Sequence, residues 1–302
     1  MRTLCIGTRG SDLALCQANF IRKYLSERHS TDTALKIIKT SGDKIDDLPF
    51  EKMEGKGFFT KELEDALLSG EIDLAVHSLK DLMTLPPDGL TIAGIGARVD
   101  RRELLLFHKN ADGESGVLPL KAGSSIGAGS ARRRSQIRHY NPLLEIKPIR
   151  GNVPTRVRKL REHEFDSIII AAAGVDRLEL DVSDLGAIRL DPEVFLPAPA
   201  QGVLGVQTRT DDTDVIELFS DFGTETEKTE TQLERGLLGK FDAGCSLPLG
   251  VFSQVENGER RLLATLGPVE ELGVTQFRTA EARGNEPGAL VNEVFESLTK
   301  RD

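Results

Sequence analysis

Short apolar runs alternate with helical patterns through the first two thirds of this chain, and the alternation restricts the folds open to it. In the first third, the runs with the length of strands are residues 3–7, 35–40 and 72–78. The apolar faces predicted for two intervening helices are formed by Leu13, Cys16, Phe20 and Tyr24, and by Phe59, Leu63, Ala66 and Leu67. Strands that alternate with helices are typical of an α/β fold with a mostly parallel sheet.

The second third repeats this pattern. Its predicted strands are residues 124–130, 144–150 and 166–174. The two thirds also resemble each other in sequence, since IGTRGS is echoed by IGAGSARR and EIDLAV by EFDSIII. We therefore expect two similar lobes with mixed, mostly parallel sheets. A ligand cleft is expected between them, because open α/β sheets bind ligands at the carboxyl ends of their strands.

The last third departs from this rhythm. Residues 195–209 are rich in proline and then offer one more apolar strand, which we expect to return to the first lobe. After about Asp214 come a helix, three strand-like runs with a turn at Glu256-Asn257-Gly258, and a final helix. This order predicts a small α+β domain.

Composition disfavours several classes of protein. No apolar run approaches the ~18 residues that span a bilayer, and the N-terminus has no signal-peptide core, so we expect a cytoplasmic protein. The three cysteines, Cys5, Cys16 and Cys245, are an odd number without CxxC spacing, which argues against a disulfide framework or a metal site. A formal net charge of −9 disfavours a general nucleic-acid binder.

One segment has the opposite charge. From Arg132 to Arg161 the chain holds ten Arg or Lys residues and one acid, Glu145. The first arginines follow a Gly-Ser turn at the start of a predicted helix, where guanidinium and backbone N–H groups bind carboxylate or phosphate. A solvated helix face is the plainer interpretation, but arginine outnumbers lysine eight to two, and arginine binds planar oxyanions through two hydrogen bonds. With one aromatic residue, Tyr140, the segment fits a small polycarboxylate better than nucleic acid.

A second group of polar residues lies at the end of the predicted strand 72–78. Asp81 is placed there to act as general acid and base or to stabilise a cation, with Lys80 and Ser78 binding an anionic substituent. On this motif alone, a helix N-cap is the commoner role of such an aspartate, and His77 is more often a core histidine than a catalyst.

A third group is the loop-like stretch DAGCSLPLG, from Asp242 to Gly250. Cys245 lies there between glycine and serine, whereas Cys5 and Cys16 lie in apolar patterns typical of a core. If one thiol is used chemically, we expect it to be Cys245, although no His/Asn arrangement marks it as a protease nucleophile.

Eight motifs, in order along the chain, resemble the porphobilinogen deaminase (hydroxymethylbilane synthase) family of tetrapyrrole and haem biosynthesis. They are IGTRGSDLAL, GKGFFTKELEDALL, DLAVHSLKD, GSARR, IRGNVPTR, AAAGVDRL, PAPAQG and GCSLPLG. The resemblance extends over nearly the whole chain.

The resemblance implies two lobes like those of periplasmic binding proteins, plus a third domain. The implied domains are residues 1–98 with 197–215 (the catalytic lobe), residues 99–196 (the arginine-rich lobe) and residues 216–302, which carry the cofactor cysteine. The implied cofactor is a dipyrromethane bound to Cys245 through a thioether. Four porphobilinogen molecules are then joined to it with loss of ammonia, and hydrolysis releases hydroxymethylbilane. A monomer without a metal is expected.

Residue roles follow from the matching motifs. Asp81 matches the family's catalytic aspartate, which stabilises the cations formed as each pyrrole is added and moves their protons. Besides Cys245, the residues implied to bind the cofactor are Ser78, Lys80, Ser130, Arg132, Arg133 and Gly151. Those implied to bind substrate are Arg9, Ser11, Lys56, Lys61, Arg150, Arg156, Arg177 and Gln201.

Several residues depart from the family pattern. Asp12 and Met83 stand where prolines are usual, Arg101 lies in DRREL where DPRDA is typical, and Ala128 and Gly129 replace a frequent Thr-Ser pair. The missing prolines affect backbone stiffness at a turn and a hinge, so we expect changed rates or domain motion rather than a changed reaction.

Two other classes of protein remain as alternatives. A two-lobed protein that only binds an anionic small molecule has the same fold, but it has no need of Cys245 and Asp81. A nucleic-acid-binding module predicts an affinity that falls steeply with salt.

Overall fold

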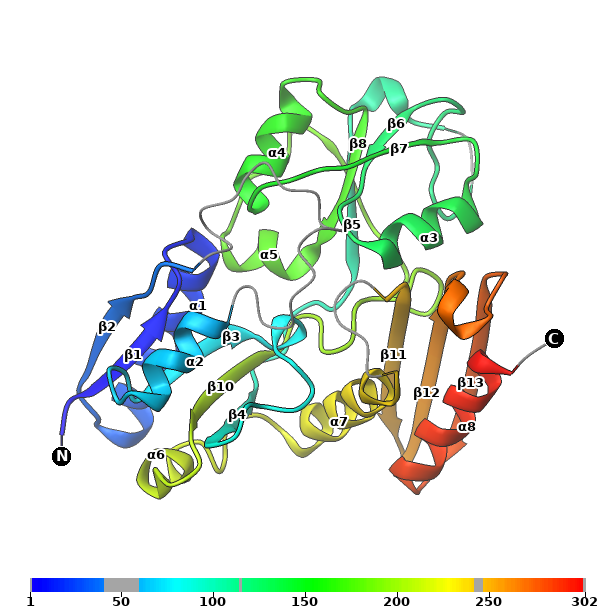
Figure 1. Cartoon of the computed structure of the whole chain (residues 1–302). Helices are drawn as coiled ribbons and strands as arrows, with labels where there is room; N and C mark the ends of the chain where they lie inside the picture. The colour runs from blue at the N-terminus through cyan, green and yellow to red at the C-terminus, as the bar shows by residue number, and fades with distance from the viewer. Residues whose placement is uncertain (1, 41–59, 114–115, 242–246, 301–302) are drawn as a thin grey trace. The chain divides into compact units, whose positions relative to one another are not determined.

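The computed structural model describes residues 2–40, 60–113, 116–241 and 247–300. The chain divides into two compact units, called here the first unit (Met1–Val99 with Gly202–Lys228) and the second unit (Asp100–Gln201 with Thr229–Asp302). Figure 1 labels most of the helices and strands of both. No helix within the described ranges is long and apolar enough to cross a membrane.

The first unit is built on a five-stranded sheet. Its strands are β1 (Leu4–Thr8), β2 (Thr33–Ile37), β3 (Leu74–Ser78), β4 (Leu90–Gly96) and β10 (Leu204–Arg209), in the order β2-β1-β3-β10-β4. Strand β1 is parallel to β2 and β3, whereas β10 is antiparallel to β3 and β4, so β10 alone opposes the other strands of this sheet. Its helices include α1 (Asp12–His29), α2 (Lys61–Leu68), α6 (Thr213–Glu217) and the short 3-10 helix η3 (Leu79–Asp81).

Helix α1 forms where the sequence predicts it, but a different face is buried. Ala14, Ala18, Ile21 and Leu25 are buried, whereas Phe20 is 48% exposed. The predicted apolar face was therefore wrong. Helix α1 packs against β1 and β3, and the small side chains of Ala14 and Ala18 allow the close approach that a face of larger residues would prevent.

Helix α2 buries the predicted face. Leu63, Ala66 and Leu67 pack with Ala75 of β3 in one apolar cluster. Phe59, the fourth residue of that predicted face, lies outside the described residues.

The second unit repeats the five-stranded sheet. Its strands are β5 (Glu103–Phe107), β6 (Ser125–Gly127), β7 (Glu145–Lys147), β8 (Ser167–Ala171) and β9 (Gly186–Arg189), in the order β7-β6-β8-β5-β9. Here β5 is the opposing strand, so both sheets share one order and one set of directions. Its helices include α3 (Ala131–Tyr140), α4 (Val153–Arg161), α5 (Ala172–Arg177) and η4 (Lys109–Ala111). The prediction of two similar lobes from the internal sequence echo is confirmed.

The second unit also contains the predicted α+β module. Its elements are β11 (Leu249–Glu256), β12 (Glu259–Leu266), η5 (Glu270–Leu272), β13 (Arg278–Gly284), α8 (Pro287–Thr299) and most of α7 (Glu225–Lys240). The three strands form an antiparallel sheet, and β11 turns into β12 at Asn257 and Gly258, whose φ angles are 51° and 84°. Two positive φ angles suit a tight hairpin, so the predicted turn is present. The division of the chain into three domains stays a prediction.

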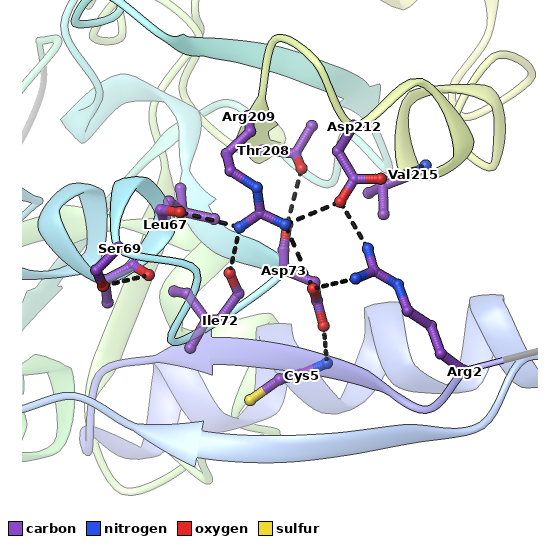
Figure 2. Close-up of polar contacts among 11 residues, drawn as sticks. Arg2, Cys5, Leu67, Ser69, Ile72, Asp73, Thr208, Arg209, Asp212 and Val215 are labelled. Atoms are coloured by element: carbon purple, nitrogen blue, oxygen red, sulfur yellow. Dashed lines mark hydrogen bonds and ion pairs between the residues drawn. The ribbon is translucent and has the colours of Figure 1, made fainter.

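A polar network closes the amino end of the first sheet (Figure 2). Arg209 of β10 donates through Nη1 to the carbonyl oxygens of Leu67 and Ile72, at 2.9 and 2.8 Å, and through Nη2 to Asp212 at 2.9 Å. Asp73 accepts from the backbone N–H of Cys5 at 2.7 Å. The guanidinium satisfies one carbonyl in the last turn of α2 and one between α2 and β3, and so helps to fix the end of the sheet opposite the carboxyl ends of β1 and β3.

Candidate active site

The first unit holds a pocket at the carboxyl ends of β1 and β3. Four of the residues singled out from the sequence line it: Arg9, Ser11, Ser78 and Asp81. The parallel strands place these side chains together because each strand ends at the same edge of the sheet. Ser11 caps α1, and its hydroxyl accepts from the backbone N–H of Ala14 at 3.4 Å.

Asp81 is the last residue of η3, the turn that follows β3. Leu79 at the start of this turn is fully buried, and its backbone N–H donates to the carbonyl oxygen of Val203 at 3.0 Å. Asp81 is exposed on the pocket wall and does not occupy an N-cap position, so the commoner structural role is not the one seen. Lys80, beside it in η3, is half-buried.

Among the other polar residues of the pocket, Gln17 was missed as a candidate, and His77 was interpreted from the sequence as a core histidine. Gln17 of α1 is buried, and its Nε2 donates to the Oγ of Ser78 at 2.8 Å. His77 of β3 is 6% exposed, and burial lowers the pKa of its imidazole to about 4. Gln17 could have been found from the sequence, because it is a polar residue on the same helix face as Ala14 and Ile21, which are buried. The imidazole of His77 is neutral near pH 7.

In the second unit, Ser130, Arg132 and Arg133 gather at the start of α3. The Ser130 hydroxyl caps the helix by accepting from the backbone N–H of Arg133 at 3.2 Å. Both guanidinium groups pair with Glu103 of β5, at 2.5 Å from Arg132 and 2.8 Å from Arg133. All three charged side chains are buried.

Glu103 is shared by several donors. Besides the two arginines, the Nε2 of Gln201 donates to its Oε1 at 3.1 Å. Burial lowers the pKa of the Arg132 guanidinium, the charge of Arg133 lowers it further, and Glu103 opposes both effects. Two guanidinium groups against one carboxylate leave a positive excess that favours an anionic ligand. The roles of the arginines and of Gln201 toward a ligand stay predictions.

Three more predicted residues of the second unit lie near one another. Gly151 has a φ of +104°, which favours glycine, and its carbonyl oxygen accepts from the Nε of Arg156 at 2.7 Å. A Cβ atom placed on Gly129 would lie 3.8 Å from the Nη1 of Arg156. Gly129, at the turn into α3, therefore leaves room beside this guanidinium. Arg150, next to Gly151, is half-buried.

The remaining predicted site residues are located here only by their secondary-structure elements. Arg177 is the last residue of α5, and Lys61 is the exposed first residue of α2. Lys56 and Cys245 lie outside the described residues. In the described ranges, no three His, Cys, Asp or Glu side chains form a group that could hold a metal ion.

Arg101, a departure from the family pattern, has a clear structural role. It donates through Nη2 to Glu230 of α7 at 2.5 Å and through Nη1 to the carbonyl oxygen of Ser253 in β11 at 2.6 Å. Its guanidinium also lies 5.2 Å from the ring centroid of Phe252. An ion pair and a backbone contact thus fix the segment around Arg101.

Fold and site together define an α/β protein with two similar five-stranded sheets and a pocket whose lining suits an anionic ligand. Among solved structures, the chain is similar to an arginine-specific periplasmic binding protein of Salmonella typhimurium (12% identity, TM-score 0.41, 73% of this chain and 91% of that chain). It is also similar to the methionine binding protein MetQ (13% identity, TM-score 0.44, 72% of this chain and 89% of that chain). These likenesses concern the fold alone.

Two family models match the sequence. The model described as "Porphobilinogen deaminase, dipyromethane cofactor binding domain" matches residues 4–217, and "Porphobilinogen deaminase, C-terminal domain" matches residues 228–300. The chain belongs to the porphobilinogen deaminase family.

Curated relatives of that name agree over most of the chain. The protein of Sulfurimonas denitrificans is 42% identical over 269 residues, which cover 88% of this chain and 84% of the relative. The protein of Syntrophomonas wolfei is 42% identical over 277 residues (90% and 88%), and that of Brevibacillus brevis is 40% identical over 297 residues (97% and 93%).

Proposed function

We propose that this chain is a porphobilinogen deaminase that joins four porphobilinogen molecules and releases linear hydroxymethylbilane for tetrapyrrole synthesis. The observation that carries the proposal is the pocket of the first unit, where Asp81 lies with Arg9, Ser11 and Ser78 at the carboxyl ends of parallel strands. Membership of the family supports the same activity.

The donors and acceptors present fit a dipyrromethane cofactor with carboxylate side chains and pyrrole N–H groups. Arg9 and the hydroxyl groups of Ser11 and Ser78 are donors for carboxylates, and Asp81 is an acceptor for N–H groups or cations. When bound through Cys245, the cofactor supplies a free pyrrole carbon to which the first substrate is joined.

Asp81 has two tasks in each addition. The bond between the aminomethyl carbon of porphobilinogen and its nitrogen breaks, and ammonia leaves. A carbon–carbon bond then forms between that carbon and the terminal pyrrole of the growing oligopyrrole. The carboxylate stabilises the positive charge that develops on the pyrrole nitrogens, and it accepts the proton lost from the newly bonded ring carbon. Its exposure on the pocket wall leaves it accessible for both.

The arginines of the second unit are proposed to balance the carboxylates of the lengthening chain. Each added pyrrole carries an acetate and a propionate, and the guanidinium groups to which we assign these carboxylates are those of Arg132, Arg133, Arg150, Arg156 and Arg177. We propose a monomer that acts in the cytoplasm. A molar mass of two chains by light scattering would count against the monomer.

Incubation of the purified protein with porphobilinogen tests the proposed activity. We expect one ammonia to be released for each porphobilinogen consumed, and a linear tetrapyrrole as product. Binding of porphobilinogen without release of ammonia would instead identify a two-lobed binding protein.

A further inference from the structure

A buried glutamine of helix α1 takes part in the wall of the Asp81 pocket. Gln17 is 3% exposed and lies on the buried face of α1, with Ala14, Ala18 and Ile21. This helix packs against β1 and β3, and Gln17 also lines the pocket. A polar side chain on an apolar helix face is costly to bury unless it is hydrogen-bonded, so the partner of Gln17 indicates its role.

That partner is the hydroxyl group of Ser78, at the carboxyl end of β3. The Nε2 of Gln17 donates to the Oγ of Ser78 at 2.8 Å, across 61 positions of sequence. This is the only side-chain hydrogen bond that either residue makes with the described part of the chain. Both residues line the same pocket, but Ser78 is half-buried whereas Gln17 is buried. The serine is thus the more accessible of the two.

The contact limits how the hydroxyl group of Ser78 can turn. An amide NH₂ group only donates, so Oγ is the acceptor here and its own proton must point elsewhere. A serine hydroxyl has one O–H and two lone pairs, and Gln17 occupies one of the lone pairs. No described residue accepts the O–H of Ser78. This proton is therefore directed to an acceptor in the pocket.

The second serine of the pocket is held in the same way. The Oγ of Ser11 accepts from the backbone N–H of Ala14 at 3.4 Å, so Ser11 too has its proton left to donate. The guanidinium of Arg9, which lines the same pocket, is a further donor. Donors that converge on one pocket suit a carboxylate, whereas a hydroxyl group free to turn serves a donor and an acceptor equally well.

We propose that Gln17 is a positioning residue that makes Ser78 a hydrogen-bond donor for a carboxylate of the pyrrole substrate. The inference deepens the proposed function and rests on it. Gln17 acts on the ligand through Ser78, so it contributes to the binding of porphobilinogen. The bond-making step belongs to Asp81 and should not depend on Gln17.

A double-mutant cycle tests this role, because Gln17 should matter only while Ser78 keeps its hydroxyl group. Gln17→Met keeps an unbranched side chain of similar length without the NH₂ group. We expect it to raise the KM for porphobilinogen about fivefold, the loss of one hydrogen bond, with kcat unchanged. In a Ser78→Ala background, the same substitution should leave KM unchanged. An equal rise in KM in both backgrounds would show that Gln17 acts through packing, and would overturn the inference.

The matched control is an amide on the exposed face of the same helix. Asn19 is exposed, and its Nδ2 donates to the carbonyl oxygen of Leu15 at 2.9 Å. Asn19→Met should leave the KM for porphobilinogen unchanged. A rise equal to that of Gln17→Met would show that any change in α1 disturbs the pocket, and would count against a role of Gln17 through Ser78.

Substrate analogues test whether the group that Ser78 binds is a carboxylate. In two analogues of porphobilinogen, a methyl group replaces either the acetate or the propionate. Their binding is measured on Asp81→Asn, which should hold pyrroles without consuming them. Gln17→Met should weaken the binding of one analogue about fivefold and leave the other unchanged, because the second lacks the carboxylate that Ser78 binds. Equal weakening of both would overturn the inference.

The two proposals fail in different ways. If the wild-type protein releases no ammonia from porphobilinogen, the proposed function is wrong, and the role of Gln17 that rests on it is wrong as well. If the wild-type protein is active and Gln17→Met has the wild-type KM, the function stands and the role of Gln17 is wrong.

Discussion

The two five-stranded sheets share one topology but differ in the chemistry at their strand ends. Since Ile6 aligns with Leu74 and Ile126 with Ser167, the register of β3 and β8 makes Ile170 and Ala171 the counterparts of His77 and Ser78. Strand β3 therefore ends in polar groups, whereas β8 ends in an apolar run. The strand order alone does not determine the chemistry.

The charges are also distributed differently in the two units. In the first unit an exposed acid, Asp81, lines an open pocket. In the second, Arg132 and Arg133 are buried and held by Glu103. The first unit thus offers an exposed carboxylate, and the second offers buried positive charge held by one carboxylate. The repeated topology supplied two equivalent positions, and different side chains gave them different tasks.

The largest expected effect concerns the acid of the first unit. Asp81→Asn should fold normally and lose about 10³-fold in turnover of porphobilinogen, because the amide can neither accept the proton nor balance the cation. Asp88→Asn, an exposed acid a few residues further along, is the control and should keep wild-type turnover. Comparable turnover in the two variants would remove Asp81 from the mechanism.

The charges of the second unit should matter most for stability. Glu103→Ala leaves two buried guanidinium groups without a counter-charge, so the free energy of unfolding should fall by about 4 kcal/mol. Glu145→Ala removes an acid whose side chain is 61% exposed, and it should change stability by less than about 1 kcal/mol. Denaturant unfolding measures both. Equal effects would mean that the arginine cluster is not held as described.

The pH dependence of stability should distinguish the two sheets, since the position in β8 that corresponds to His77 in β3 is occupied by Ile170. Burial, and to a smaller extent the charge of Arg9, depress the pKa of His77 to about 4, from an unfolded value of about 6.5, against a weaker opposing effect of Gln207. The unfolded state then binds more protons in this window. The stability that the neutral His77 contributes is therefore fully present above pH 6.5. As the pH falls from 6.5 to about 4, the free energy of unfolding decreases by at most about 3 kcal/mol on account of His77.

His77→Gln should remove this part of the acid sensitivity. Unfolding by urea at intervals between pH 7 and 4 gives the slope of the unfolding free energy against pH for the wild type and for the variant. A variant that loses stability with acid as steeply as the wild type would show that His77 is not held neutral.

The smallest predicted effect tests a feature that the two sheets share. Ser11 caps α1, which follows β1, and Ser130 caps α3, which follows β6, the strand at the same place in the order of the second sheet. Replacement of either by alanine should lower the free energy of unfolding by about 1 kcal/mol, because one helix N–H loses its acceptor. Asparagine at either position keeps an acceptor and is the control. Losses that differ widely would mean that the two helix starts are not equivalent.

Much of the architecture was predictable because it depends on local patterns. Apolar runs between helical stretches gave the strands, and the internal echo predicted the repeated sheet. The family resemblance implied ligand-contacting roles for Arg9, Ser11, Ser78 and Asp81, and the structure brings all four to one pocket because parallel strands end at the same edge of the sheet.

Other features depend on contacts that no local pattern shows. Glu103 meets Arg132 and Arg133 across about 30 positions of sequence, and nothing around Glu103 announces a buried acid. The face of α1 was misjudged because Phe20 outweighs alanine in a hydrophobic pattern, although alanine packs more closely against a sheet. Gln17 shares that buried face.

The central claim is that the chain carries a covalent dipyrromethane on Cys245 and extends it. The intact mass of the denatured protein, compared with that of Cys245→Ser, tests it most directly. We predict a wild-type excess equal to two linked pyrrole units that is absent from the variant. A wild-type mass equal to that of the bare chain, even after incubation with porphobilinogen, would contradict the claim and favour a two-lobed binding protein.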